Sequence, residues 1–244
     1  MPLSTLTWAL QMILNRHDLI WLTARGWDNV QADARAQPMA VRDAIARWRA
    51  ADWPLVVRRA EPGMEVRMVA LGMPLPPDTV TGIRPPVSCL AERCEVERQE
   101  PPLPLAAVLQ SAPPQWRSGL LALHMESLES LERQPPLRVF GSLAWQTITG
   151  MTYLRGSSDI DLLFAPTTRR EVDDGIEMLS RHGDVLPLDG EIVFPSGAAV
   201  AWKEWRDSAR PDGMSPLEDA RVLTKQHDQV ALVSCSALLA TLAG

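Results

Sequence analysis

The chain has 244 residues, of which 46% are hydrophobic and 22% are charged, with a formal net charge of −6. This composition is that of a globular protein long enough for one large domain or two small ones. The acidic balance argues against a nucleic-acid binder that works by bulk electrostatics, because such proteins usually show a basic patch.

The first fourteen residues are apolar but lack the pattern of a signal peptide. The first positive charge, Arg16, follows the apolar run, and no small-residue cleavage site comes after it. No stretch reaches the roughly 18 apolar residues of a membrane span. Three cysteines with no second metal-ligand pair fit a reducing cytoplasm better than a disulfide framework or a zinc site. We therefore expect a cytoplasmic protein without a membrane partner, with translation starting at Met1 or Met12.

The first half of the chain has the pattern of short strands, one helix and proline-rich turns. We expect strands over 18–22, 54–59 and 64–71, and a helix over 41–51. Prolines are dense between about 72 and 115, which predicts an irregular connection without long regular elements.

The pattern changes at Trp116, so the predicted domain boundary lies near residue 115. It separates an N-terminal α/β domain with its proline-rich connection (1–115) from a C-terminal domain (116–244). A helical stripe follows the boundary and ends before Pro135, and its expected members are Leu120, Leu121, His124, Leu128 and Leu131. On this stripe, His124 is expected to be a core or boundary histidine and not a metal ligand.

The remainder of the chain alternates strands and helices, which predicts an α+β fold. Strands are expected over 137–140, 159–164, 191–194 and 199–202, the last two as a hairpin. Thr168 and Glu171 form a capping box that opens a helix ending at Gly183. The final run, 230–242, is compatible with helix or strand, and we favour a buried helix.

The clearest chemical signal lies between Phe140 and Phe164. Asp159 and Asp161 are two apart in an apolar strand, so their side chains share one face. Neighbouring carboxylates repel, and burying them unpaired is costly, so the pair predicts a cation between them. Hard oxygen ligands next to Gly141 and Ser142 indicate Mg²⁺ and a polyphosphate. Gly141 allows close approach of the backbone, and Ser142 is expected to cap a helix whose N-terminus favours anions.

These residues suit nucleotidyl transfer, in which metal ions hold the phosphate oxygens while a hydroxyl attacks the α-phosphorus. A third carboxylate commonly completes such a site. Glu191 is the expected third carboxylate, and Asp189 is the alternative. Exposed strands also carry alternating acids without a function, but the apolar surroundings and the Gly-Ser pair favour a site here.

The order strand, Gly-Ser, helix, and strand with Asp-x-Asp resembles the DNA polymerase β-like nucleotidyltransferase superfamily. That resemblance implies a C-terminal α+β domain with a mixed sheet and flanking helices. The segment between Ser142 and Asp159 is longer than usual, which leaves room for Trp145 and Gln146 to line the substrate pocket.

A narrower resemblance covers about residues 15–240. It is carried by the order of short segments: Arg16-His17-Asp18, Pro54–Arg59, Leu71–Pro76, Gly141-Ser142 with Trp145-Gln146, Ser158-Asp159-Ile160-Asp161, and Val200-x-Trp202-x-Glu204-Trp205. Together these segments look like the MdcG family, the phosphoribosyl-dephospho-CoA transferases (holo-acyl carrier protein synthases) of malonate decarboxylase.

The family resemblance implies a donor, 2′-(5″-triphosphoribosyl)-3′-dephospho-CoA, and an acceptor serine on the acyl carrier protein subunit of malonate decarboxylase, with release of pyrophosphate. It implies Mg²⁺ on Asp159 and Asp161, with Glu191 as a further catalytic residue. The residues expected to contact substrate are Gly141, Ser142, Trp145, Gln146, Ser158, Arg58 and Lys203. His17 and Asp18 match the family without a role that we can derive.

Two other functions remain open on the sequence. One keeps the nucleotidyltransferase fold but uses an ordinary ATP or CTP on another acceptor. The other is a non-catalytic module that binds a nucleotide or a carrier protein. The intact aspartates and Gly-Ser pair disfavour the second of these.

Overall fold

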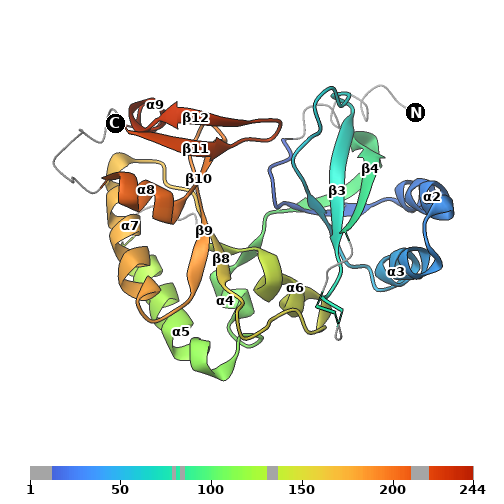
Figure 1. Cartoon of the computed structure of the whole chain (residues 1–244), viewed down its shortest axis with the longest axis horizontal. Coiled ribbons are helices and arrows are strands. Elements are labelled where there is room, and N and C mark those ends of the chain that lie inside the picture. The colour runs from blue at the N-terminus through green and yellow to red at the C-terminus, as the bar shows by residue number, and fades with distance from the viewer. Residues whose placement is uncertain (1–12, 79–80, 83–85, 131–136, 210–219, 244) are drawn as a thin grey trace. The chain divides into compact units, whose positions relative to one another are not determined.

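The computed structural model describes residues 13–78, 81–82, 86–130, 137–209 and 220–243 (Figure 1). The chain divides into two compact units, Met1–Pro102 and Leu103–Gly244. Each unit contains its own sheet, so the expected α+β organisation with a smaller N-terminal part is confirmed. None of the helices in the described ranges is both long and apolar enough to cross a membrane.

The N-terminal unit is built on a five-stranded antiparallel sheet in the order β4-β3-β2-β1-β5. Its strands are β1 (Leu19–Leu22), β2 (Leu55–Val57), β3 (Met68–Pro74), β4 (Pro86–Glu92) and β5 (Val96–Glu100), and its helices are α2 (Ala24–Asp33) and α3 (Met39–Ala50). Helix α3 confirms the helix expected over 41–51. Trp48 from this helix is buried and donates a hydrogen bond from Nε1 to the carbonyl of Pro54 (2.8 Å).

Two expectations for this half were wrong. The strand expected over 64–71 begins only at Met68, because residues Glu61 to Met68 form consecutive turns closed by backbone hydrogen bonds. The proline-rich stretch also holds two strands, β4 and β5, where an irregular connection was expected. Pro86 lies at the first residue of β4, a position where a missing N–H is tolerated.

The predicted boundary near residue 115 differs from the division in the structure, which falls after Pro102. Strand β6 (Leu103–Pro104) already pairs with β7 (Arg138–Val139) of the second sheet. Helix α4 (Leu105–Val108) follows, and both Leu105 and Val108 are buried in the C-terminal core. A two-residue strand and a one-turn helix leave too short a pattern to be read from sequence.

The structure gives Asp18 a role in the N-terminal unit. Its carboxylate is 3% exposed and accepts hydrogen bonds from the backbone N–H of Asn15 (2.8 Å) and from Nε2 of Gln99 (2.7 Å). Burial raises the pKa of Asp18 above its ordinary value, against the hydrogen bonds, which lower it. Asp18 therefore ties the entry of β1 to β5.

We expect Asp18→Ala to lower the free energy of unfolding by about 1–3 kcal/mol, because the Gln99 amide and the Asn15 N–H lose a buried acceptor. Urea denaturation monitored by circular dichroism measures this change. The matched control is Asp28→Ala, which removes an exposed carboxylate bonded to Arg49 and is expected to change stability by less than about 0.5 kcal/mol. Equal effects of the two substitutions would contradict the role given to Asp18.

The C-terminal unit holds a seven-stranded sheet in the order β12-β11-β10-β9-β8-β7-β6. The strands not yet given are β8 (Ile160–Phe164), β9 (Leu188–Val193), β10 (Ala199–Ala201), β11 (Arg221–Lys225) and β12 (Val230–Ser234). The helices are α5 (Pro114–Ser130), α6 (Gly141–Thr149), α7 (Arg169–Gly183), α8 (Trp202–Ala209) and α9 (Cys235–Leu239). All strand pairs are antiparallel except β8 and β9, which run parallel.

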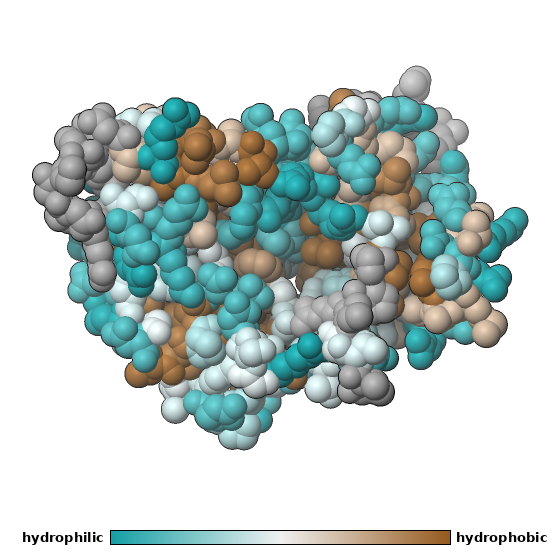
Figure 2. Space-filling view, in the orientation of Figure 1, coloured by the Kyte–Doolittle hydropathy of each residue, from teal (hydrophilic) through white to brown (hydrophobic). Residues whose placement is uncertain are grey.

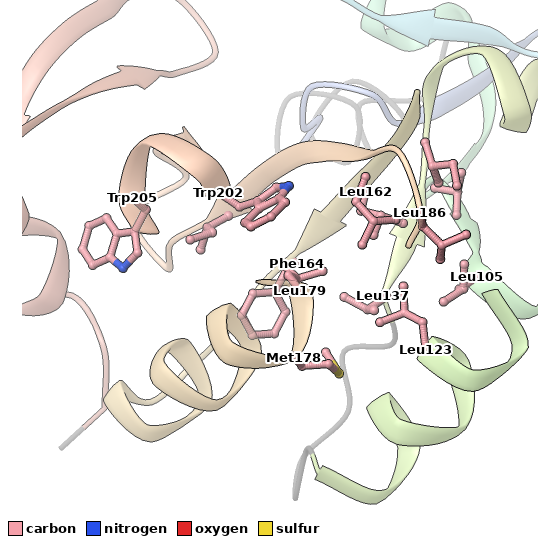
Figure 3. Packing of buried hydrophobic residues seen from close by; sticks show 14 of the residues in the cluster. Leu105, Leu123, Leu137, Leu162, Phe164, Met178, Leu179, Leu186, Trp202 and Trp205 are labelled. Atoms are coloured by element: carbon pink, nitrogen blue, oxygen red, sulfur yellow. The ribbon is translucent and has the colours of Figure 1, made fainter. Parts of the chain in front are cut away.

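Helix α7 is the crossover between the two parallel strands, and it starts as expected. Thr168 is its N-cap, its side chain accepts from the N–H of Glu171, and Glu171 completes the capping box. The helix packs closely on β8: a Cβ at Gly175 would lie 2.3 Å from the ring of Phe164. Figure 3 shows Phe164 next to Leu179 and Met178 of this helix, within the core of the unit.

The stripe expected on α5 was right at Leu120 and wrong at Leu121 and Leu128. Leu120 and Leu123 are fully buried, whereas Leu121 is 50% and Leu128 40% exposed. Figure 2 shows hydrophobic side chains at the surface over this helix. His124 is half-buried, as expected for a boundary residue, and Leu131 lies outside the described residues. The final run, favoured as a helix, instead forms strand β12 followed by the short helix α9.

Candidate active site

Three carboxylates meet at the start of the parallel strands β8 and β9. Asp161 and Asp189 are register partners across this pair, and Asp159 directly precedes β8. One carboxylate oxygen from each residue lies within 4.8 Å of those of the other two. Asp161 and Asp189 are half-buried and Asp159 is exposed. Three acidic oxygens at this separation repel one another, so they form a fitting set of ligands for a hard divalent cation.

Helix α6 begins directly against this cluster. Gly141, its first residue, has φ +67°, and a Cβ built on it would lie only 1.8 Å from Oδ2 of Asp161. The N–H of Phe140 donates to the carbonyl of Asp161 (3.0 Å), which fixes the helix start to β8. Only glycine allows this approach, because any side chain would occupy the position of the carboxylate.

Ser142 is the second residue of α6 and is 7% exposed. It was expected to cap this helix, but Phe140 holds the N-cap position, and no side chain makes a cap hydrogen bond there. The N–H groups in the first turn of a helix have no acceptor within the helix, so they are suited to donate to a bound anion next to Asp161.

The third carboxylate at the cluster is Asp189 and not Glu191. Glu191 is 6% exposed, and its Oε1 accepts a hydrogen bond from Nζ of Lys225 (2.9 Å). Gly190 separates the two acids with φ +131°, and a Cβ there would lie 2.0 Å from the carbonyl oxygen of Leu162. This close approach of β9 to β8 leaves Asp189 beside Asp161, while Glu191 lies further along the strand, opposite Leu163.

We expect Asp189→Asn to reduce transfer roughly ten- to hundredfold, because it removes one negative charge from the three-carboxylate cluster that fits a divalent cation. Glu191→Gln keeps the side-chain volume and is expected to reduce transfer less than about fivefold. Initial rates at saturating Mg²⁺, with a titration of the metal requirement, measure both. A larger loss in Glu191→Gln than in Asp189→Asn would restore Glu191 as the third catalytic carboxylate.

Lys203, in the first turn of α8, brings a positive charge to the cluster. Its Nζ lies 3.8 Å from Oδ1 of Asp189, and the side chain is half exposed. The structure therefore places this expected substrate-binding residue next to the aspartates.

Trp145 and Gln146 do not have the pocket-lining positions expected of them. Trp145 is 6% exposed and is not among the residues that line the two cavities described below. The Gln146 side chain bonds to backbone: Nε2 donates to the carbonyl of Ser111 (3.0 Å), and Oε1 accepts from the N–H groups of Tyr153 (3.2 Å) and Leu154 (3.3 Å). Gln146 thus holds the long segment between α6 and β8 in place, which is a structural role.

A cavity of about 430 Å³ opens beside Asp159. Its walls include the segment that leads into β8, with Leu154, Arg155 and Ser158, together with Trp116 at the start of α5 and Pro187 before β9. Ser158 also accepts a hydrogen bond on Oγ from the N–H of Arg155 (2.9 Å), which closes the turn before Asp159. Apart from Ser158 and Asp159, no residue expected at the site lines this cavity.

Arg58 lies in the N-terminal unit, where it is exposed and lines a separate cavity of about 370 Å³ with Val87 and Cys89. Burial raises the pKa of the Cys89 thiol to about 12, so this cysteine is a thiol at neutral pH. Burial also raises the pKa of Cys235. Neither residue therefore has the low-pKa thiolate that a cysteine nucleophile needs.

Two family models match this chain in adjoining segments. The model of the phosphoribosyl-dephospho-CoA transferase MdcG N-terminal domain matches residues 15–102, and that of the MdcG C-terminal domain matches residues 104–236. The junction between them coincides with the division between the two structural units.

Curated relatives extend over nearly the whole chain. A protein of Xanthomonas campestris pv. campestris (strain 8004) is 33% identical over 225 residues, which are 91% of this chain and 95% of the relative. A protein of Bradyrhizobium diazoefficiens is 37% identical over 218 residues, 88% of this chain and 92% of the relative. Both are named phosphoribosyl-dephospho-CoA transferase. No solved structure matches the chain.

Proposed function

The chain belongs to the MdcG family of phosphoribosyl-dephospho-CoA transferases, and from this premise we propose the specific reaction that its carboxylate cluster performs. The donor is 2′-(5″-triphosphoribosyl)-3′-dephospho-CoA. The acceptor is a serine hydroxyl on the acyl carrier protein subunit of malonate decarboxylase. The products are the serine phosphodiester that carries the prosthetic group, and pyrophosphate.

The observation that carries this proposal is the meeting of Asp159, Asp161 and Asp189 at the start of α6. The acidic cluster and the helix start fit the two parts of a metal-bound triphosphate. The three carboxylates would hold Mg²⁺, which when bound neutralises phosphate charge and lowers the pKa of a coordinated hydroxyl. The N–H groups in the first turn of α6 would bind the β- and γ-phosphates.

The chain's own residues would hold the leaving group, accept the proton and offset the phosphate charge. The serine Oγ attacks the α-phosphorus, and the bond from that phosphorus to the oxygen bridging to the β-phosphate breaks. The electron pair of this bond leaves with pyrophosphate, which the start of α6 holds. Asp189 would accept the serine proton on a carboxylate oxygen, and Lys203, 3.8 Å from Asp189, would offset the charge on the phosphates.

Arg58 is proposed to contact the CoA-derived part of the donor, because its exposed, positively charged side chain lines a cavity in the N-terminal unit. The cytoplasm is the proposed compartment, because the three cysteines are free thiols and fit a reducing environment.

The test is intact-protein mass spectrometry of the acyl carrier subunit after incubation with this protein, Mg²⁺ and the triphosphoribosyl donor, with ATP and CTP as parallel donors. The expected result is a mass gain equal to the phosphoribosyl-dephospho-CoA group, abolished by EDTA and by Asp159→Asn. A gain of only a nucleoside monophosphate would replace the proposed donor by an ordinary nucleotide. No gain with any donor from folded protein would overturn the proposed reaction.

A further inference from the structure

We infer that the cavity beside Asp159 binds the adenosine diphosphate portion of the donor's dephospho-CoA group. This inference rests on the proposed function and names where one half of its donor binds. The cavity lies entirely within the C-terminal unit, together with the carboxylate cluster.

The first argument is the order of groups along the site. Gly141 lies against Asp161, and on the same face of the strand the next side chain is that of Asp159, which lines the cavity. In-line displacement at the α-phosphorus puts the leaving pyrophosphate on one side of the reacting atom and the attacking oxygen on the other. The ribose of the donor is bonded to an equatorial oxygen of the α-phosphorus, so it extends to one side of this line, and the cavity beside Asp159 gives it space.

The second argument is chemical. The cavity has apolar walls from Trp116, Leu154 and Pro187, and polar groups from Gln115 and Ser158. A volume of about 430 Å³ lies within the range of pockets that bind nucleotide-sized ligands. A purine ring would contact the apolar walls, and its ring nitrogens and amino group would exchange hydrogen bonds with the polar groups.

The third argument is charge. The dephospho-CoA half carries a diphosphate, and Arg155 at the cavity supplies a guanidinium. Guanidinium groups bind phosphate oxygens through paired hydrogen bonds. Asp159 is the acid that lines the cavity, and the metal proposed at the cluster would neutralise it. The cavity therefore presents an apolar wall, hydrogen-bonding groups and a cation to a ligand that has a ring, hydroxyls and an anion.

The structure supplies a substitution that tests the cavity without disturbing the fold. Gly156 lines the cavity, a Cβ added to it would meet no atom within 4 Å, and it is not among the glycines with positive φ. Gly156→Phe therefore fills the cavity from an exposed turn at no backbone strain. Arg155→Glu reverses the charge at the same place. The matched control is Arg170→Glu on the exposed side of α7, where the arginine pairs with Asp174.

The first experiment uses 3′-dephospho-CoA as the probe and isothermal titration calorimetry on the full chain in Mg²⁺, so that the charge of Asp159 at the cavity is offset. We expect Gly156→Phe and Arg155→Glu each to weaken binding by about tenfold or more, through lost space and lost charge pairing. Arg170→Glu should bind as the unchanged protein does. Undetectable binding to the unchanged protein, or equal affinity in all variants, would overturn the inference.

The second experiment separates the inference from the proposed function by steady-state kinetics. Gly156→Phe is expected to raise KM for the donor with a smaller change in KM for the carrier protein. If carrier modification proceeds and only the KM for the carrier rises, the cavity receives the acceptor and the inference is wrong while the function stands. If dephospho-CoA binds in the cavity but no carrier is modified by any donor, the proposed function fails and the binding site stands.

Discussion

Replacing Asp161 by Asn is expected to reduce transfer by about a thousandfold or more. Asp161 is the central member of the cluster: it is the register partner of Asp189, and its Oδ2 lies where a Cβ on Gly141 would lie. Removing its charge takes away both a proposed metal ligand and the negative group next to the helix start. Losses of this size follow when a group that stabilises charge in the transition state is removed.

The same substitution separates function from stability. Because three carboxylates lie within 4.8 Å of one another, neutralising one of them relieves repulsion in the metal-free protein. The free energy of unfolding of Asp161→Asn, measured in EDTA, is therefore expected to be unchanged or higher. Asp173→Asn, at an exposed carboxylate on α7 that pairs with Arg169, is the control and should keep transfer within about twofold. If Asp161→Asn lost activity only in proportion to its unfolded fraction, the role proposed for Asp161 in transfer would be contradicted.

The two aspartates at β8 could be predicted from the sequence because strand periodicity depends only on neighbouring residues. Asp159 and Asp161 share a face in any register of the sheet. The third carboxylate could not be predicted in this way. Asp189 and Glu191 also share a face of their strand, and only the register of β9 against β8 decides which of them meets Asp161. Register is set by long-range pairing, which a single sequence does not reveal.

The role of Gln146 shows a second limit of sequence-based prediction. A polar side chain after a Gly-Ser pair fits substrate binding, and its sequence position gives no reason to exclude this. The structure commits its amide to the backbone of Ser111, Tyr153 and Leu154. Buried polar atoms of loops need such partners, and the partner in this case comes from a segment 35 positions away. The resemblance identified the residue, but only the fold assigned its hydrogen bonds.

Gly141→Ala tests the geometry of the site more sharply than the removal of a charge. Gly141 is the first residue of helix α6, and Gly150 directly follows the helix. Both residues have a left-handed backbone conformation, with φ +67° and +70° respectively. An alanine at either position costs about 1–2 kcal/mol for this conformation. At Gly150 the added methyl meets nothing within 4 Å, whereas at Gly141 it would lie 1.8 Å from Oδ2 of Asp161. The two variants therefore share a backbone cost and differ in what the methyl displaces.

The Asp161 carboxylate is the end of a side chain and can rotate away from an alanine at 141 at small energetic cost. We therefore expect the free energies of unfolding of Gly141→Ala and Gly150→Ala to fall by similar amounts. Transfer should differ strongly: Gly141→Ala is expected to lose about a hundredfold or more, since misplacing a reacting or metal-binding group by about 1 Å has an effect of this order. Gly150→Ala should keep most of its activity. Initial rates and urea denaturation on both variants measure the two quantities. Equal loss of activity in the two variants would mean that Gly141 is needed only for its left-handed backbone conformation. The position of Asp161 against the start of α6 would then not determine transfer.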